Sequence, residues 1–388
     1  MVPFRIAAWS LALALAIAAT AVAQAPAPAC RACKDAGVVP CGRHGRSSYE
    51  DDPLVRLCSD AIACKACAGA LAVDCKRCAN ETAEAALRAR QQLAADWLEA
   101  RRKHVDDAVG HRTLHHLETA HCDLVFGLEH LTIDKHKHDG HAAAHVYGRR
   151  LEALREDFRS VFELAEEDLP GRLRVYVFRT QKEHGVIGPR ETGLGSATSV
   201  GLKQMGPEFV FSMWQDPRSV ASDEALHRCV VHHVTHLLLS QMLPVQWLGN
   251  RKHGWIDEGL AHWFEDRLDG KCTNYCYEEV LTVPGAGWKN GVWRPSVRAL
   301  VERGELPSFA QLATRNTDQL TFVEHAAAFA YTDFLIGARG GAAFRDLVRA
   351  LKQGQDTRDA LPQVYQWNPL TIEEPFQAWV REHYPLPR

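Results

Sequence analysis

Hydrophobic positions along the chain follow two spacings, and together they predict a mixed α+β protein. Residues 141–164 place apolar side chains at helical spacing, which predicts a helix. Shorter apolar runs at 117–126, 173–178 and 208–213 predict strands, and we expect the last to lie at an edge of the sheet. The C-terminal third returns to helical spacing and predicts a helical subdomain, with helices at residues 296–303, 308–314, 321–337, 341–353 and 374–383.

Two further segments are apolar on nearly every side yet contain residues that can bind a metal ion. The first surrounds His232 and His236 with valine and leucine, and the second, residues 254–265, contains Glu258. A helix that is apolar all round is a buried one, and buried histidines need partners. Residues four apart lie on one helix face, so His232 and His236 can bind one zinc ion. Glu258 is the best candidate for a third ligand, and water can take the fourth position of such a site.

The order of these segments resembles that of the gluzincin metallopeptidases. That family carries an H-E-x-x-H motif, here His232–His236, and a downstream W-[LI]-[ND]-E-G-[FL]-A stretch, which Trp255–Ala261 matches. The resemblance covers about residue 115 to the C-terminus. It implies a zincin-like domain, with a small mixed sheet and a buried metal-binding helix. It also implies that an edge strand beside the cleft, here 208–213, holds peptide substrate, although an ordinary core strand is the alternative.

The motif departs from the family at one position, because His233 stands where the general-base glutamate is expected. Three hypotheses follow: a zinc-binding domain without efficient catalysis, an active hydrolase that uses His233 or a nearby carboxylate, or core histidines without a metal. The family also implies an oxyanion-stabilising tyrosine or histidine in the C-terminal part. His325 and Tyr331 are the candidates, and a core role is the alternative for each.

An internal repeat near the N-terminus predicts two further zinc sites. It has the spacing C-x2-C-x7-C-x2-[HC] and recurs after 34 positions. The first set is Cys30, Cys33, Cys41 and His44, and the second is Cys64, Cys67, Cys75 and Cys78. Each set has the four ligands that a structural zinc needs, from one local stretch. The pattern is similar to zinc-ribbon and DnaJ-type cysteine-rich modules. Disulfides are the alternative in an exported protein, but the histidine favours a metal.

The first 23 residues predict a secretory signal peptide. Arg5 precedes an apolar run at 7–19, and Ala21-Val22-Ala23 forms a cleavage site. An uncleaved anchor is the alternative. We therefore expect an exported protein, periplasmic or extracellular, with no membrane span after cleavage. The expected segments after the signal peptide are an Ala-Pro tether at 24–29, the cysteine-rich module at 30–80, a helical linker at 81–114 and the peptidase-like domain at 115–388.

Charge and composition add little to this functional picture. The net charge is −3 and no long basic run is present, so a nucleic-acid partner is not implied. Ten histidines fall between 104 and 145. Among them, His111 with His115 and His141 with His145 have a spacing that could chelate a surface metal, but a polar, partly solvated face is the preferred interpretation. The sequence thus predicts an exported, zinc-binding, peptidase-like protein that binds a peptide or protein and has weak or no peptidase activity. An active zinc peptidase and a non-catalytic adaptor acting through the cysteine-rich module are the alternatives.

Overall fold

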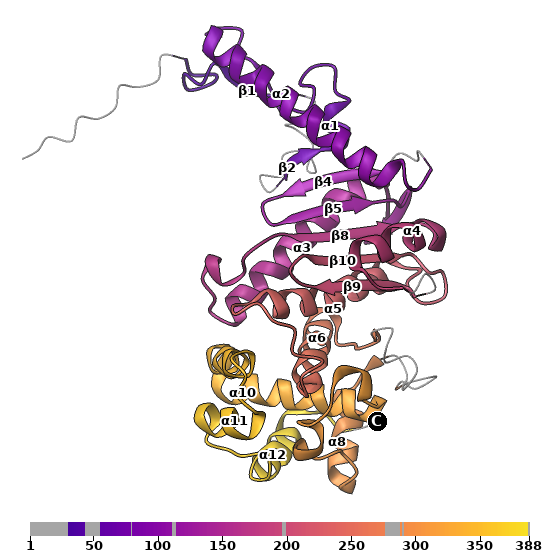
Figure 1. Cartoon of the computed structure of the whole chain (residues 1–388), viewed down its shortest axis with the longest axis vertical. Helices are drawn as coiled ribbons and strands as arrows, with labels where there is room; N and C mark the ends of the chain where they lie inside the picture. Colours follow the sequence, from indigo (N-terminus) through magenta and orange to yellow (C-terminus); the bar gives the residue numbers. More distant parts are fainter. Residues whose placement is uncertain are drawn as a thin grey trace, which may run out of the picture.

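The computed structural model describes residues 30–42, 55–78, 80–110, 114–195, 199–275, 288 and 291–386. The expected signal peptide, the Ala-Pro tether, His44 and Cys276 lie outside these residues. The described chain is a mixed α+β protein, as predicted, with a cysteine-rich end, a central mixed sheet and a C-terminal group of helices along one long axis (Figure 1). Among its helices none combines the length and apolar character needed to cross a membrane.

Six strands form the central sheet in the order β2-β4-β5-β8-β10-β9. Strand β8 is parallel to both β5 and β10, whereas the other neighbours are antiparallel. The strands are β2 (Val55–Cys58), β4 (His115–Thr119), β5 (Cys122–Phe126), β8 (Leu173–Phe178), β9 (Gly201–Met205) and β10 (Phe209–Trp214). The predicted strand at 173–178 is confirmed as β8.

The single strand predicted at 117–126 is wrong, because the chain turns back there to form β4 and β5. Within the turn, the hydroxyl oxygen of Thr119 accepts a hydrogen bond from the backbone N–H of Cys122 at 3.0 Å. From a distant helix, the carboxylate of Glu152 accepts hydrogen bonds from the backbone N–H of His121 at 2.8 Å and from the hydroxyl of Thr119 at 2.5 Å. The contact with Glu152 cannot be predicted from the residues around the turn.

The strand predicted at the sheet edge is also placed differently. Strand β10 lies inside the sheet, between β8 and β9, and the edge belongs to β9. Residues 201–205 read Gly-Leu-Lys-Gln-Met and lack the apolar alternation that would have predicted a strand. The alternative of an interior strand therefore holds for residues 209–214.

Alternating side chains of the interior strands fill the two faces of the sheet. In β8, Val175 and Val177 belong to the main hydrophobic core, while Tyr176 and Phe178 belong to a smaller core on the opposite face. Helices α3 (Gly140–Val161) and α5 (Asp223–Gln241) pack in the main core. The opposite face is covered by α4 (Gln181–Thr192) and the π-helical turn η1 (Arg102–Asp106). The period of two in the strands thus builds both layers.

The N-terminal part contains two short strands, a short helix and one long helix. Strand β1 (Val38–Pro40) pairs with β3 (Ala72–Asp74), and α1 (Ser59–Ile62) follows β2 directly. Helix α2 (Glu81–Arg101) begins at Asn80, whose side chain accepts a hydrogen bond from the N–H of Ala83. It confirms the helix expected after residue 80 and runs from the cysteine-rich end toward the sheet (Figure 1).

The C-terminal helices follow the predicted order with two differences. They are α6 (Gly254–Asp269), α8 (Arg294–Arg303), α9 (Phe309–Leu312), α10 (Phe322–Lys352), α11 (Thr357–Tyr365) and α12 (Glu373–His383). The two helices expected at 321–337 and 341–353 adjoin within α10, where Gly340 takes a φ of 79° and interrupts the helix. Helix α11 was not predicted, because it is short and has Pro362 within it. The remaining short elements are β6 (His130–Ile133), β7 (His136–Asp139), η2 (Glu166–Asp168) and η4 (Thr317–Gln319).

Candidate metal centres

Three of the predicted ligands meet between α5 and α6. Nε2 of His236 lies 3.4 Å from Nε2 of His232 and 3.2 Å from Oε1 of Glu258, and Nε2 of His232 lies 3.6 Å from Oε2 of Glu258. Ligand atoms around a tetrahedral zinc are separated by roughly 3.3 Å, so these three side chains can hold one metal ion. We call His232, His236 and Glu258 the His/Glu centre. All three residues have 0% exposure.

Helix packing explains how Glu258 reaches the two histidines. The next residue, Gly259, lies against α10, where an added Cβ would come within 2.4 Å of the Thr332 hydroxyl and 2.5 Å of the Ala328 carbonyl oxygen. Only glycine therefore allows α6 and α10 to pack this closely. Gly259 thus allows the close contact of α6 with α10, while the neighbouring Glu258 lies against the histidines of α5.

Two further carboxylates contact the Nδ1 atoms of the histidine ligands, on the side of each ring away from the metal site. Nδ1 of His236 lies 3.0 Å from Asp257, and Nδ1 of His232 lies 3.1 Å from Glu265. Asp257 in turn accepts hydrogen bonds from the indole N–H of Trp247 at 2.8 Å and the hydroxyl of Thr317 at 3.2 Å. A carboxylate behind a ligating histidine fixes the ring orientation and leaves Nε2 for a metal. Asp257 lies inside the matched motif, but neither this role nor that of Glu265 was predicted.

The protonation of the two histidine ligands suits a metal site. Burial lowers the pKa of His232 well below its usual range. Burial also lowers the pKa of His236 to about 4, although Asp257 acts in the opposite direction. Burial alone would raise the pKa of Asp257, but His236, Lys203 and the indole N–H of Trp247 together outweigh it and the pKa is lowered. At neutral pH the rings are therefore neutral imidazoles, the form that binds metal ions.

Two more histidines lie beside the His/Glu centre. Nδ1 of His325 lies 3.7 Å from Oε2 of Glu258 and 3.1 Å from Nε2 of His262, whose own Nδ1 lies 2.9 Å from Glu265. His325 is thus brought to the centre from α10. His262 was missed, although its position four residues after Glu258 on one helix could have indicated it.

Tyr331, the other candidate for an oxyanion-stabilising residue, lies in the core. Its hydroxyl donates a hydrogen bond to Glu373 at 2.9 Å, and its ring stacks on Phe376 at a centroid distance of 3.8 Å. These contacts occupy both ends of the side chain. The core role left open for Tyr331 in the sequence therefore fits the structure.

A cavity of about 740 Å³ opens on one side of the centre. It is lined by strand β9, the segment after α5 and residues 316–318, and His233 is part of its wall. His233 is 6% exposed and its ring stacks on Phe211 at 4.7 Å. Burial lowers the pKa of His233 well below its usual range. The residue at the expected general-base position thus lines the cavity, and its ring centroid lies 5.0 Å from that of His232 and 6.5 Å from that of His236.

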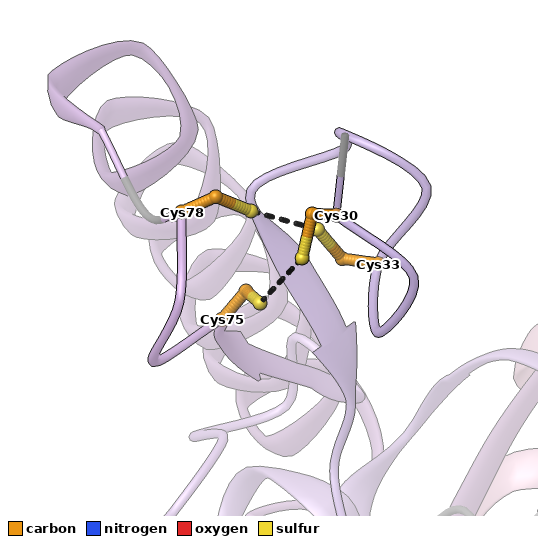
Figure 2. A group of neighbouring side chains, drawn as sticks. All are labelled: Cys30, Cys33, Cys75 and Cys78. Carbon is orange, nitrogen blue, oxygen red and sulfur yellow. Dashed lines mark hydrogen bonds between the residues drawn. The ribbon is translucent and has the colours of Figure 1, made fainter. Parts of the chain in front are cut away.

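The cysteine-rich module groups its ligands differently from the prediction. Cys30 and Cys33 meet Cys75 and Cys78, whereas Cys41 meets Cys64 and Cys67. Within each group the sulfur atoms lie within 4.8 Å of one another. Figure 2 shows the first group, with Sγ of Cys33 3.0 Å from Sγ of Cys78 and Sγ of Cys30 3.8 Å from Sγ of Cys75. The expectation that each set comes from one local stretch is wrong.

The pairing of β1 with β3 explains this exchange. The two strands are antiparallel, with Val38 opposite Asp74 and Pro40 opposite Ala72. The residues before β1 therefore lie beside those after β3, and the residue that follows β1 lies beside those before β3. As a result, each of the two sites contains cysteines from both halves of the repeat. All cysteines in the described part of the chain are unbridged. His44, which was predicted to bind one metal together with Cys30, Cys33 and Cys41, lies outside this part.

Comparison with known proteins returns no relative. No protein-family model matches the chain, and no curated protein matches it significantly. The resemblance to gluzincins and to DnaJ-type modules therefore rests on the motif residues alone.

Proposed function

We propose that this protein is an exported, zinc-binding, peptidase-like protein that binds a peptide or protein ligand and hydrolyses it weakly or not at all. The convergence of His232, His236 and Glu258 supports the zinc site of the central domain. The two cysteine groups support structural zinc sites at the N-terminal end. A predicted signal peptide supports export.

The roles of the carboxylates near the His/Glu centre support the proposal that catalysis is weak or absent. A zinc peptidase needs a base that takes a proton from metal-bound water. Glu258 is a ligand, and Asp257 holds His236 from behind. Glu265 accepts hydrogen bonds from the backbone N–H groups of Thr273 at 2.9 Å and Asn274 at 3.2 Å. All three carboxylates thus have other roles, and none replaces the glutamate expected at position 233.

The observation that carries the proposal is the position of His233. The three ligands have 0% exposure, and of the histidines at the centre only His233 contributes to the cavity wall. A catalytic zinc keeps a coordination position open to water and substrate. Here a ligand in the cavity meets the His233 ring before it meets the metal. The substitution thus removes the base and also covers the site.

The cavity wall favours an extended peptide as the ligand. Strand β9 forms one side of the cavity and lies at the end of the sheet, where β10 is its only partner among the described strands. A peptide can add to such an edge through its main chain. Lys203 and Arg251 contribute positive charge to the wall, and Asp318 is its one carboxylate among the described residues. We therefore expect peptides with acidic side chains or a free carboxylate to bind more tightly than basic ones.

The test is to restore the glutamate in the full mature chain. His233→Glu, loaded with zinc, is expected to cleave a mixed peptide library much faster than the native chain and the matched control His233→Gln, which show little or no cleavage. Equal zinc content in the three proteins excludes metal loss as the cause. Cleavage by the native chain at a rate close to that of His233→Glu, and its loss in Glu258→Gln, would overturn the proposal and show an active hydrolase.

A further inference from the structure

A cluster of one cysteine and two histidines, which differs from the cysteine groups and from the His/Glu centre, lies where the cysteine-rich end meets the sheet. Sγ of Cys58, at the end of β2, is 3.7 Å from Nε2 of His141 and 3.5 Å from Nε2 of His145. The two histidines lie one turn apart near the start of α3. Cys58 is 4% exposed and His145 is 2% exposed. None of these residues belongs to the centres described above.

A carboxylate lies next to the cluster. Oδ2 of Asp60, in α1, lies 4.0 Å from Sγ of Cys58 and 3.0 Å from Nδ1 of His115. The ligand atoms that all lie within 4.8 Å of one another are those of Cys58, His141 and His145. One thiol and two imidazoles are ligands of the types that zinc accepts.

We propose that Cys58, His141 and His145 bind a zinc ion that fastens β2 to α3. In a tetrahedral site with ordinary zinc bond lengths, a sulfur and a nitrogen ligand are separated by roughly 3.6 Å. The two sulfur–nitrogen distances, 3.7 Å and 3.5 Å, lie on either side of this value. The inference does not depend on the proposed peptidase-like function.

Hydrogen bonding can also join these groups, because a thiol can donate to one imidazole and its sulfur can accept weakly from the N–H of the other. The metal content of the protein distinguishes the two explanations. A reactive thiol–imidazole pair would need an accessible sulfur, and Cys58 is buried. A shared metal ion accounts for the convergence of both rings.

The position of the site indicates its purpose. Residues 55–62 lie in the sequence between Cys41 and Cys64, and thus between the two halves of the cysteine-rich module. Strand β2 is only four residues long, and its pairing with β4 is irregular between Val55 and Leu57. A zinc ion would fasten this segment to α3, which packs on β4 and β5. The site would therefore hold the cysteine-rich end against the sheet (Figure 1).

Metal content tests the proposal in the full mature protein, purified without chelator. Cys58→Ser and His141→Ala are each expected to bind one zinc fewer per chain than the native protein. His136→Ala, an exposed histidine of the neighbouring β7, is the matched control and should keep the native content. His141 is only partly buried, so His141→Ala keeps the test valid if Cys58→Ser does not fold.

Two further measurements separate metal loss from general damage. Amide exchange should rise within residues 55–62 of the His141→Ala variant, while β8 and β10 keep native protection. Alkylation of Cys58 by iodoacetamide, mapped by mass spectrometry, should begin only after chelation in the native protein. Native zinc content in a folded His141→Ala variant, or alkylation of Cys58 at equal rates with and without chelator, would overturn the proposal.

Discussion

The cysteine-rich module and the His/Glu centre both bring metal ligands together, but they are built in opposite ways. In the module the buried core is made of the ligands themselves: one cluster contains Cys30, Cys33 and Cys75, the other Cys41, Cys64 and Cys67. Val39 and Val73 are the apolar residues packed against them. The His/Glu centre instead lies on two helices inside the largest hydrophobic core.

This difference predicts which region needs its metal ion in order to fold. A segment with almost no apolar core gains its folding free energy from metal binding. Helices α5 and α6 bury aliphatic and aromatic side chains on all sides and can fold before a metal arrives. Metal should therefore be structural at the N-terminal end and dispensable for folding at the centre.

The largest expected effect is the response of the two regions to a chelator. Structural zinc contributes about 10–16 kcal/mol in small zinc domains, so removal should unfold the module. Amide exchange should show loss of protection in residues 30–42 and 64–78, while β5, β8 and β10 stay protected. Cys75→Ser should reproduce this loss, and Lys76→Ala, an exposed neighbour, should not. Unfolding of the module by reductant but not by chelator would instead show disulfides.

The second effect concerns the centre alone. Glu258→Gln removes a negatively charged ligand and should weaken zinc binding there by more than about 100-fold. Because the core remains packed, the free energy of unfolding of the metal-free protein should change by less than about 2 kcal/mol. Isothermal titration calorimetry and urea unfolding measure the two quantities, with exposed Glu224→Gln on α5 as the control. Collapse of the whole domain would show that the centre, like the module, depends on its metal.

The third effect concerns how the stability of the sheet domain depends on pH. Burial lowers the pKa of His184 to about 4, and its Nδ1 lies 2.9 Å from the Ser212 hydroxyl. The folded pKa lies below the unfolded value of about 6.5, so the unfolded state takes up the proton first as pH falls. Above pH 6.5, His184 therefore does not reduce the unfolding free energy of the metal-free sheet domain. As the pH falls from 6.5 to 4, protonation of His184 in the unfolded state lowers this free energy by up to about 3 kcal/mol.

Urea unfolding at several pH values checks this contribution. The double variant His184→Leu/Ser212→Ala removes the imidazole together with the hydroxyl that it contacts, and should show a shallower loss of stability between pH 6.5 and 4. Ser212→Ala alone is the control. An equal pH dependence in the double variant and in the control would contradict the assignment.

The smallest effect tests the carboxylates behind the histidines. Asp257→Asn weakens the hold on His236 and should lower zinc affinity at the centre by about 10- to 100-fold, with no change at the cysteine sites. Competition with a chromophoric chelator measures this shift, and exposed Asp96→Asn on α2 is the control. Equal loss at all sites would point to a general change of the protein instead.

The features that could be predicted from the sequence are those that depend on local periodicity. Helices α5 and α6 and strand β8 follow from apolar spacing, and the convergence of His232, His236 and Glu258 follows from motif residues on two buried helices. The features that differ depend on contacts between distant segments. Glu152 contacts the turn between β4 and β5, and the pairing of β1 with β3 decides which cysteines meet. The cluster around Cys58 joins residues more than 80 positions apart.

The histidine-dense stretch, residues 104–145, also shows that contacts between distant segments cannot be predicted from the local sequence. Spacing on the chain indicated a polar, partly solvated face, and several of its members are exposed. His116 and His145 are instead buried at 1% and 2% exposure, because their elements pack against η1 and the β2–α1 segment. Neither packing partner can be read from the residues around these histidines.

The central claim is that His232, His236 and Glu258 share one metal ion in the mature protein. Anomalous diffraction at the zinc absorption edge, on crystals grown without chelator, tests it most directly. The claim predicts a peak within bonding distance of Nε2 of both histidines and a carboxylate oxygen of Glu258. Peaks at the cysteine groups with no peak between α5 and α6 would contradict it.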